Sequence, residues 1–157
     1  MPIDSAPIYM IRTFTLADAP ACLAIFDGNV PRFFGAHERA DFATYLQQPA
    51  RAADYLVIER DDRVVACGGL AMDDALTAAF CWGMVDHTVH RQGLGRALGQ
   101  ARLQQARARG ARRVVLSTSQ HTCDFYAGLG FGITRVVTDG HGPGLDAVDM
   151  QRVLSLG

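Results

Sequence analysis

The sequence contains no lysine, because all 15 basic residues among its 157 residues are arginines. This absence excludes enzymes that form a Schiff base on lysine, nucleotide-binding proteins that need a Walker lysine, and self-acetylation of a lysine side chain. Acidic and basic residues nearly balance, with a formal net charge of -1. The overall charge therefore predicts no nucleic-acid or membrane partner, and any ligand must be recognised locally.

Cysteine pairs, long apolar spans and metal-ligand spacings are also missing. The four cysteines are widely spaced and form no Cys-x-x-Cys pair, which favours reduced thiols and a cytoplasmic protein. No apolar run approaches the roughly 18 residues of a spanning helix, and no charged-then-apolar leader opens the chain. His87, His90 and His121 lack the His-x-x-x-His and His-Glu-x-x-His spacings of zinc sites, so we expect no metal.

The hydrophobic pattern predicts one domain with a real core, over residues 9–157, after a loose extension over residues 1–8. Alternating apolar residues predict strands, and helical spacings predict helices. The strands are expected over 9–14, 55–60, 64–72, 76–85, 114–117, 131–137 and 147–154, and the helices from 15 to about 27 and over 36–48, 93–109 and 122–129. This order, βααβββαβαββ, predicts an α/β fold with a mixed, mostly antiparallel sheet and helices on both faces. The arginine-rich stretch 100–113 is predicted to be a solvated helix face.

The segment over residues 85–98 carries the most chemical information, and it reads Val-Asp-His-Thr-Val-His-Arg-Gln-Gly-Leu-Gly-Arg-Ala-Leu. It combines a strand end, a loop with glycines and a helix start. Unpaired backbone N–H groups at a helix N-terminus, with Arg91 and Arg96 nearby, suit a pyrophosphate. Leu98 stands where the dinucleotide motif Gly-x-Gly-x-x-Gly needs a third small residue, and no Gly-Lys-Ser/Thr follows, which disfavours NAD and ATP.

Two motifs resemble those of one family. Residues 90–95, His-Arg-Gln-Gly-Leu-Gly, resemble the acetyl-CoA loop Gln/Arg-x-x-Gly-x-Gly/Ala of the GCN5-related N-acetyltransferase (GNAT) family. Residues 119–131, Ser-Gln-His-Thr-Cys-Asp-Phe-Tyr-Ala-Gly-Leu-Gly-Phe, are similar to its later motif Asn-x-x-Ala-x-x-Leu-Tyr-x-x-x-Gly-Phe. His90, Ser119 and Thr122 depart from these patterns. The resemblance implies a GNAT-like acyl-CoA N-acyltransferase fold, acetyl-CoA as co-substrate, an amine acceptor and a homodimer through the last strands.

The resemblance also implies where the cofactor lies. The strand over 80–85 is expected to splay from the strand over 114–117, with the pantetheine arm in the gap. The cofactor contacts are then expected from the backbone of Met84 and Val85 and from His90, Arg91, Gln92, Gly93, Leu94, Gly95, Arg96, Ala97, Ser119 and Tyr126. Tyr126 matches the family's tyrosine, whose hydroxyl can protonate the leaving CoA thiolate.

A base is needed only if the acceptor amine arrives protonated. The candidates are His121, His87, Asp146 and Asp149, and the pattern itself favours none of them. We name His121 with Tyr126 as the catalytic candidates, because His121 stands beside the cofactor helix.

The acceptor site is expected from two segments that overhang the acetyl group. Asp27, Asn29, Phe33 and Phe34 form a mixture that suits a small amine with an apolar part, although the phenylalanines would equally serve as core. The glycine-rich connection 138–149 is predicted to be a mobile lid or a plain surface loop.

The leading hypothesis is an N-acetyltransferase that transfers acetyl from acetyl-CoA to a primary amine, by direct attack in a ternary complex. The acceptor is unidentified and expected to be a small molecule. A covalent route through Cys123 is conceivable, but packing is the expected role of that residue. The alternative function is a non-catalytic acyl-CoA-binding regulatory module.

Overall fold

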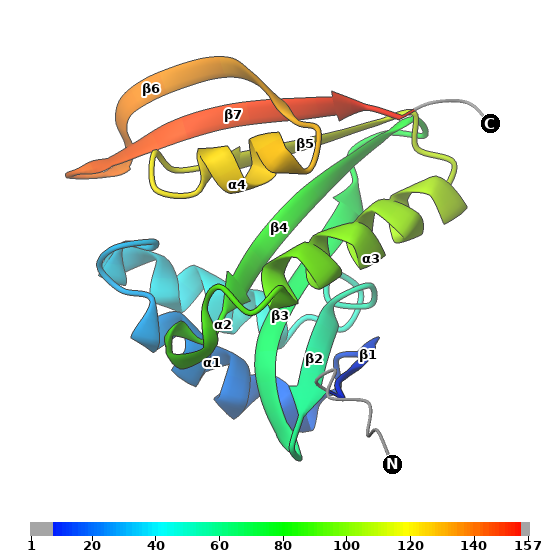
Figure 1. The fold of residues 1–157 in the computed structure, drawn as a ribbon, viewed down its shortest axis with the longest axis vertical. Helices are drawn as coiled ribbons and strands as arrows, with labels where there is room; N and C mark the ends of the chain where they lie inside the picture. Colours follow the sequence, from blue (N-terminus) through cyan, green and yellow to red (C-terminus); the bar gives the residue numbers. More distant parts are fainter. Residues whose placement is uncertain (1–7, 155–157) are drawn as a thin grey trace, which may run out of the picture.

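A seven-stranded sheet runs through the computed structural model, which describes residues 8–154 (Figure 1). The strands are β1 (Met10–Thr13), β2 (Leu56–Arg60), β3 (Arg63–Met72), β4 (Thr77–Val85), β5 (Arg113–Thr118), β6 (Gly132–Gly142) and β7 (Leu145–Val153). The α-helices are α1 (Ala19–Gly28), α2 (Arg39–Leu46), α3 (Leu94–Ala108) and α4 (Cys123–Gly128). This order confirms the predicted α/β fold. Of the extension predicted over residues 1–8, all but Ile8 lies outside the described residues.

The sheet opens between its two middle strands. The strand order is β1-β2-β3-β4-β5-β7-β6, and every neighbouring pair is antiparallel except β4 and β5. These two parallel strands pair only over 77–79 and 113–115. Beyond that point β4 stays with β3, while β5 stays with β7 as far as Thr118. The expected splay is therefore present, and it leaves a gap that side chains and a ligand can share.

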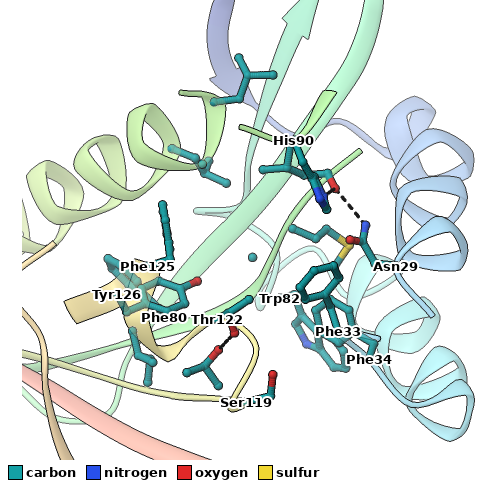
Figure 2. Close-up of a pocket in the computed structure, with 18 of the residues that line it drawn as sticks. Asn29, Phe33, Phe34, Phe80, Trp82, His90, Ser119, Thr122, Phe125 and Tyr126 are labelled. Atoms are coloured by element: carbon teal, nitrogen blue, oxygen red, sulfur yellow. Dashed lines mark hydrogen bonds between the residues drawn. The ribbon is translucent and has the colours of Figure 1, made fainter. Parts of the chain in front are cut away.

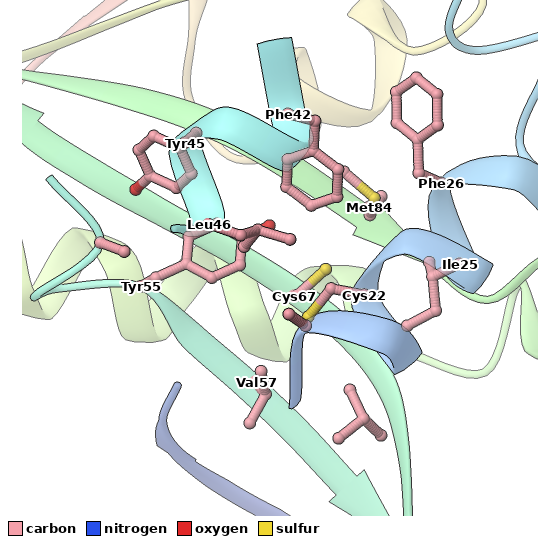
Figure 3. Packing of buried hydrophobic residues seen from close by; sticks show 13 residues of the cluster. Cys22, Ile25, Phe26, Phe42, Tyr45, Leu46, Tyr55, Val57, Cys67 and Met84 are labelled. Carbon is pink, nitrogen blue, oxygen red and sulfur yellow. The ribbon is translucent and has the colours of Figure 1, made fainter. Parts of the chain in front are cut away.

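Helices cover both faces of the sheet. On one face, Phe26 of α1 and Phe42 of α2 pack in a cluster with Val57 of β2 (Figure 3). On the other face, Leu56 and Ile58 of β2 pack with the first turns of α3. Since successive residues of β2 are buried on opposite faces, the strand reads as a continuous apolar run. Within the described residues, no helix has the length and apolar character that a membrane span requires.

The connection predicted as a loop or lid over residues 138–149 is instead a hairpin. Strand β6 continues to Gly142 and β7 begins at Leu145, so only a short turn joins them. The turn is fixed by side chains: the N–H of Asp139 donates to Asp146 Oδ1 at 3.0 Å, and Gln120 Nε2 donates to the carbonyl of Gly144 at 2.8 Å. The pairing of β6 with β7 is irregular between Val137 and Gly142, as the glycines indicate, but it resumes with Gly142 opposite Leu145, so the connection is a hairpin.

The arginine-rich stretch is also not uniformly solvated. Arg102 of α3 is only 2% exposed. It stands four residues after Leu98 and four before Ala106, both of which are buried, so it belongs to the apolar stripe of the helix. The prediction is therefore wrong for Arg102, whereas Arg107, Arg109, Arg112 and Arg113 are exposed as predicted.

A buried carboxylate ties β1 to the start of α1. Asp18, 8% exposed, accepts hydrogen bonds from Arg12 at 2.8 and 2.9 Å and from the backbone N–H of Thr15 at 2.8 Å. The Arg12 hydrogen bond lowers the pKa of Asp18, burial opposes this, and the bonds from Thr15 lower it further. The charged form is therefore the one that the fold stabilises.

We expect Asp18→Asn to lower the free energy of unfolding by about 2 kcal/mol at pH 7, the scale of hydrogen bonds to a charged group. The pKa of Asp18 in the folded state lies below the unfolded value near 4. The full difference in stability is therefore present above about pH 5, and it shrinks as pH falls through the unfolded and then the folded pKa. Urea unfolding of both proteins across pH 3–8 measures it. Asp27→Asn, which removes the exposed partner of Arg39, is the matched control and should cost much less. Equal losses, or a difference independent of pH, would contradict the assignment.

Candidate functional site

A pocket of about 540 Å³ occupies the gap between β4 and β5 (Figure 2). Its walls come from the second half of β4, the loop before α3, the first turns of α3, the end of β5, and α4. The lining contains three arginines, Arg91, Arg96 and Arg102, against one carboxylate, Glu38. This excess of positive charge favours an anionic ligand.

The loop before α3 presents backbone to the pocket. Gly93 has φ +82°, a left-handed conformation that suits glycine, and the helix begins at the next residue. Leu94 is buried under the helix and anchors the turn. A Cβ on Gly95 would lie 3.3 Å from the ring of Phe125, so the absence of a side chain lets α4 approach. The N–H groups of the first helical turn have no helical acceptor and are available to an anion.

The carbonyl of Val85, at the end of β4, accepts hydrogen bonds from two side chains of the protein. Asn29 Nδ2 donates to it at 2.9 Å, and His90 Nε2 donates at 2.8 Å (Figure 2). Asn29 is buried and also donates to the carbonyl of Ile25, so it joins α1 to β4. A backbone contact of Val85 to a ligand would therefore use its N–H and not its carbonyl.

A β-bulge lies in the middle of β4. Cys67 of β3 pairs with Met84, but Gly69 pairs with Cys81, so two residues of β4 face one of β3. Trp82 in this bulge has φ +48°, which is unusual for a large side chain. The hydroxyl of Tyr55, which is fully buried, donates to the carbonyl of Trp82 at 2.7 Å. Burial raises the pKa of Tyr55, which keeps the phenol protonated as donor.

We expect Tyr55→Phe to lower the free energy of unfolding by about 1–2 kcal/mol, because it leaves the Trp82 carbonyl without its donor. Denaturant unfolding measures the change. Tyr45→Phe is the control: among the described residues its hydroxyl has one hydrogen-bond partner, the sulfur of Cys81 at 3.5 Å, so the loss should be smaller. If both variants lose the same stability, the bulge is not held by Tyr55.

Tyr126 extends from α4 into the pocket beside Arg102. Its ring packs edge-on against Phe125 and Phe131, with centroids 5.0 and 5.9 Å apart. Its hydroxyl lies 3.4 Å from Nη2 of Arg102. The aromatic neighbours fix the ring and leave the hydroxyl at the gap, beside Arg102.

The structure brings together most of the predicted site residues. The lining includes Asn29, Phe33, Phe34, Met84, Val85, His90, Arg91, Gly93, Leu94, Gly95, Arg96, Ser119 and Tyr126. Ser119 is buried, and its Oγ accepts the N–H of His121 at 3.2 Å, so it also shapes the turn before α4.

Other predicted residues lie outside the lining. Gln92 binds Arg60 on the surface, and Asp27 pairs with Arg39. Ala97 packs at the edge of the core. His121 is exposed, with its ring 6.3 Å from that of Phe33, and its role as base stays a prediction.

Sequence reasoning missed several groups in the pocket. Glu38 is the residue just before α2, and His141 reaches in from the β6 hairpin, where it shares a hydrogen bond of 2.9 Å with Ser117. Trp82 enters through the bulge. For Glu38 and His141 the sequence held no signal, because the topology alone brings them to the gap. For Trp82 the following glycine, inside a strand, was a weak sign of a bulge.

The fold and the loop have counterparts in known proteins. No curated protein sequence matches this one. Among solved structures, Ard1 from Thermoplasma volcanium superposes with a TM-score of 0.80 at 20% identity, over 94% of this chain and 99% of that one. The ribosomal-protein-S18-alanine N-acetyltransferase from Escherichia coli gives 0.79 at 20% identity, over 96% of each chain.

A third similar structure contains a bound cofactor. N-acetylglutamate synthase from Neisseria gonorrhoeae, complexed with coenzyme A and N-acetyl-glutamate, gives a TM-score of 0.73 at 17% identity, over 95% of this chain and 36% of that one. These identities establish the fold alone. The family model of the acetyltransferase (GNAT) family matches residues 22–131, which is most of the chain, and it covers the glycine loop, the splayed strands and Tyr126. The chain therefore belongs to the acetyltransferase (GNAT) family.

Proposed function

We propose that the protein is an acetyl-CoA-dependent N-acetyltransferase that acetylates a primary amine of a small molecule by direct attack. The observation that carries this proposal is the joining of the β4–β5 gap to the glycine loop of α3 in one pocket. A long ligand with an anionic part can place its phosphates on the loop and its thioester in the gap.

The cofactor-binding part is argued from the backbone. The N–H groups of the first turn of α3 would hold the pyrophosphate, with Arg91 and Arg96 adding charge. The pantetheine arm would run between β4 and β5, where the N–H of Val85 is the available backbone donor. Gln92 and Ala97 lie outside the pocket lining and support the loop rather than the ligand.

The reaction needs one proton donor and one proton acceptor. The amine nitrogen forms a bond to the carbonyl carbon of the thioester, the carbon–sulfur bond breaks, and the Tyr126 hydroxyl protonates the leaving sulfur. The amine loses its proton to a base or to solvent. Glu38 and His141 line the same pocket, so we add both to His121 as candidate bases.

The acceptor would approach from the side of α1 and α2. Phe33 and Phe34 line the pocket there. The ring of Phe33 lies 5.5 Å from His90, and that of Phe34 stacks at 6.3 Å on Trp82. This wall is apolar and has Glu38 at its edge, which suits an amine attached to an apolar body.

Thermal unfolding with and without acetyl-CoA tests the cofactor. A ligand that binds only the native state at 100 times its Kd adds about 2.7 kcal/mol of stability, so the midpoint should rise with acetyl-CoA but not with ATP or NAD. No rise at saturating acetyl-CoA would overturn the proposal. Release of free CoA only when an amine is supplied would then support the enzyme. Binding without release across an amine screen would favour the regulatory module instead.

A further inference from the structure

Arg102 is a buried cation with no carboxylate partner among residues 8–154. Its guanidinium lies 4.1 Å above the ring of Phe80 and lines the pocket. Its hydrogen bonds are long: 3.3 Å to the carbonyl of Gly69 and 3.4 Å to the hydroxyl of Tyr126. Its Nε has no hydrogen-bond partner among the residues that the structure describes. The charge is therefore desolvated without the usual compensation.

The neighbouring strands make room for this side chain. A Cβ on Gly83 of β4 would lie 2.7 Å from Nη2 of Arg102, and a Cβ on Gly68 of β3 would lie 3.1 Å from Cζ. Two adjacent strands thus carry glycine at the positions facing one guanidinium. Glycine weakens a strand interior, and an unpaired buried charge is unfavourable in a core. Such departures from local structural preference are typical of functional sites.

We propose that Arg102 binds a carboxylate at the end of the acyl group, so that the site takes short acidic acyl-CoA donors in preference to neutral donors of the same carbon number. This inference rests on the proposed function, because it assigns a residue to the part of the same pocket that holds the acyl group. A carboxylate would accept a pair of N–H···O hydrogen bonds from the guanidinium and would balance its charge.

The position of Arg102 favours the donor over the acceptor as the source of that carboxylate. Arg102 is on α3, seven residues after Gly95 of the phosphate loop, which is about 10 Å along the helix axis. It also adjoins Tyr126, the group proposed to protonate the thioester sulfur. Phe33 and Phe34, proposed for the acceptor, come from the α1–α2 side of β4 (Figure 2).

The transfer itself is unchanged by the acidic group. The amine nitrogen bonds to the thioester carbonyl carbon, the carbon–sulfur bond breaks, and the sulfur takes the proton of Tyr126 while the amine gives up its own. The distal carboxylate stays ionised against Arg102 throughout. The product is an amide that carries a free carboxylate, together with free CoA.

Isothermal titration calorimetry with four donors tests the inference without knowledge of the acceptor. Succinyl-CoA is compared with butyryl-CoA, and malonyl-CoA with propionyl-CoA, in the wild type and in Arg102→Met. We expect the wild type to bind at least one acidic donor more tightly than its neutral match. In the variant that affinity ratio should fall by at least about 30-fold, the scale for one partner of a buried charge pair. Arg102→Met should also melt no lower than the wild type without ligand, because it removes an unpaired buried charge.

Gly83→Ala is the second variant, since its Cβ displaces the guanidinium while keeping the charge. It should lose the same preference for acidic donors. If neutral donors bind well and acidic donors do not bind better, this inference fails and the proposed function stands. If no acyl-CoA binds at all, the proposed function fails first.

Three other results would also overturn the inference. A lower melting temperature of Arg102→Met with an equal loss for all four donors would make Arg102 structural. In rate assays with an amine identified by screening, a similar loss of kcat with every donor would mean that Arg102 acts on Tyr126. Unchanged donor affinities, with a lost preference for a free amino acid over its amide among acceptors, would assign the carboxylate to the acceptor.

Discussion

Tyr126→Phe should lower kcat by about 100- to 10,000-fold, the range that a positioned general acid contributes. The ring keeps its edge-on contacts with Phe125 and Phe131, so the variant should fold and should bind acetyl-CoA with nearly the same Kd. The effect belongs to the step in which the thiolate leaves. Initial rates of CoA release with an amine identified by screening, together with calorimetric Kd values, measure both quantities.

Tyr45→Phe is the matched control for this substitution. It removes the hydroxyl of a buried tyrosine that bonds to Cys81 and lies outside the pocket lining, so its kcat should be unchanged. If Tyr126→Phe retains wild-type kcat within about threefold, the thiolate departs without this acid. If instead the Kd for acetyl-CoA rises as much as kcat falls, Tyr126 holds the cofactor rather than donating a proton.

The order of elements was predictable from the sequence, because the face that each helix or strand buries determines the spacing of its apolar residues. The apolar stripe of α3 has a helical period, and the apolar runs of β2 and β5 are too short for a helix and rich in β-branched residues. The β6–β7 hairpin was not predictable in full, because glycines at 140, 142 and 144 indicate irregular backbone. The irregularity is present between Val137 and Gly142, but the pairing of Gly142 with Leu145 depends on the partner strand.

The glycine loop before α3 was also predictable, since its glycines and the helix start are contiguous in the chain. The rest of the pocket was not. Glu38, His141 and Trp82 come from three segments that only the fold brings together. The spacing of Arg102 from Leu98 and Ala106 did place it on the apolar face of α3. A charged residue is normally excluded from such a position unless it has a functional role, so the sequence alone favoured exposure.

Replacing an arginine by glutamate is expected to raise the stability of the protein at the N-terminus of α3 and to lower it at the C-terminus. Arg96→Glu puts a carboxylate in the first turn, where the helix dipole stabilises it by about 0.3–1 kcal/mol, while it repels a pyrophosphate bound there. Losing one attraction and gaining one repulsion, each about 1 kcal/mol in a water-like dielectric, gives about 2 kcal/mol and about 30-fold weaker binding of acetyl-CoA. Calorimetry and thermal unfolding measure the two effects separately.

Arg107→Glu makes the same change of net charge in the last turn of the same helix. Both arginines are exposed, so neither variant disturbs packing. At this end a carboxylate opposes the dipole and should lower stability, while the Kd for acetyl-CoA should stay at the wild-type value. The Arg96→Glu effect on Kd should shrink at high salt, because exposed charges are screened. Equal Kd changes in the two variants would mean that net charge alone attracts the ligand, and that the pyrophosphate does not bind at the N-terminus of α3.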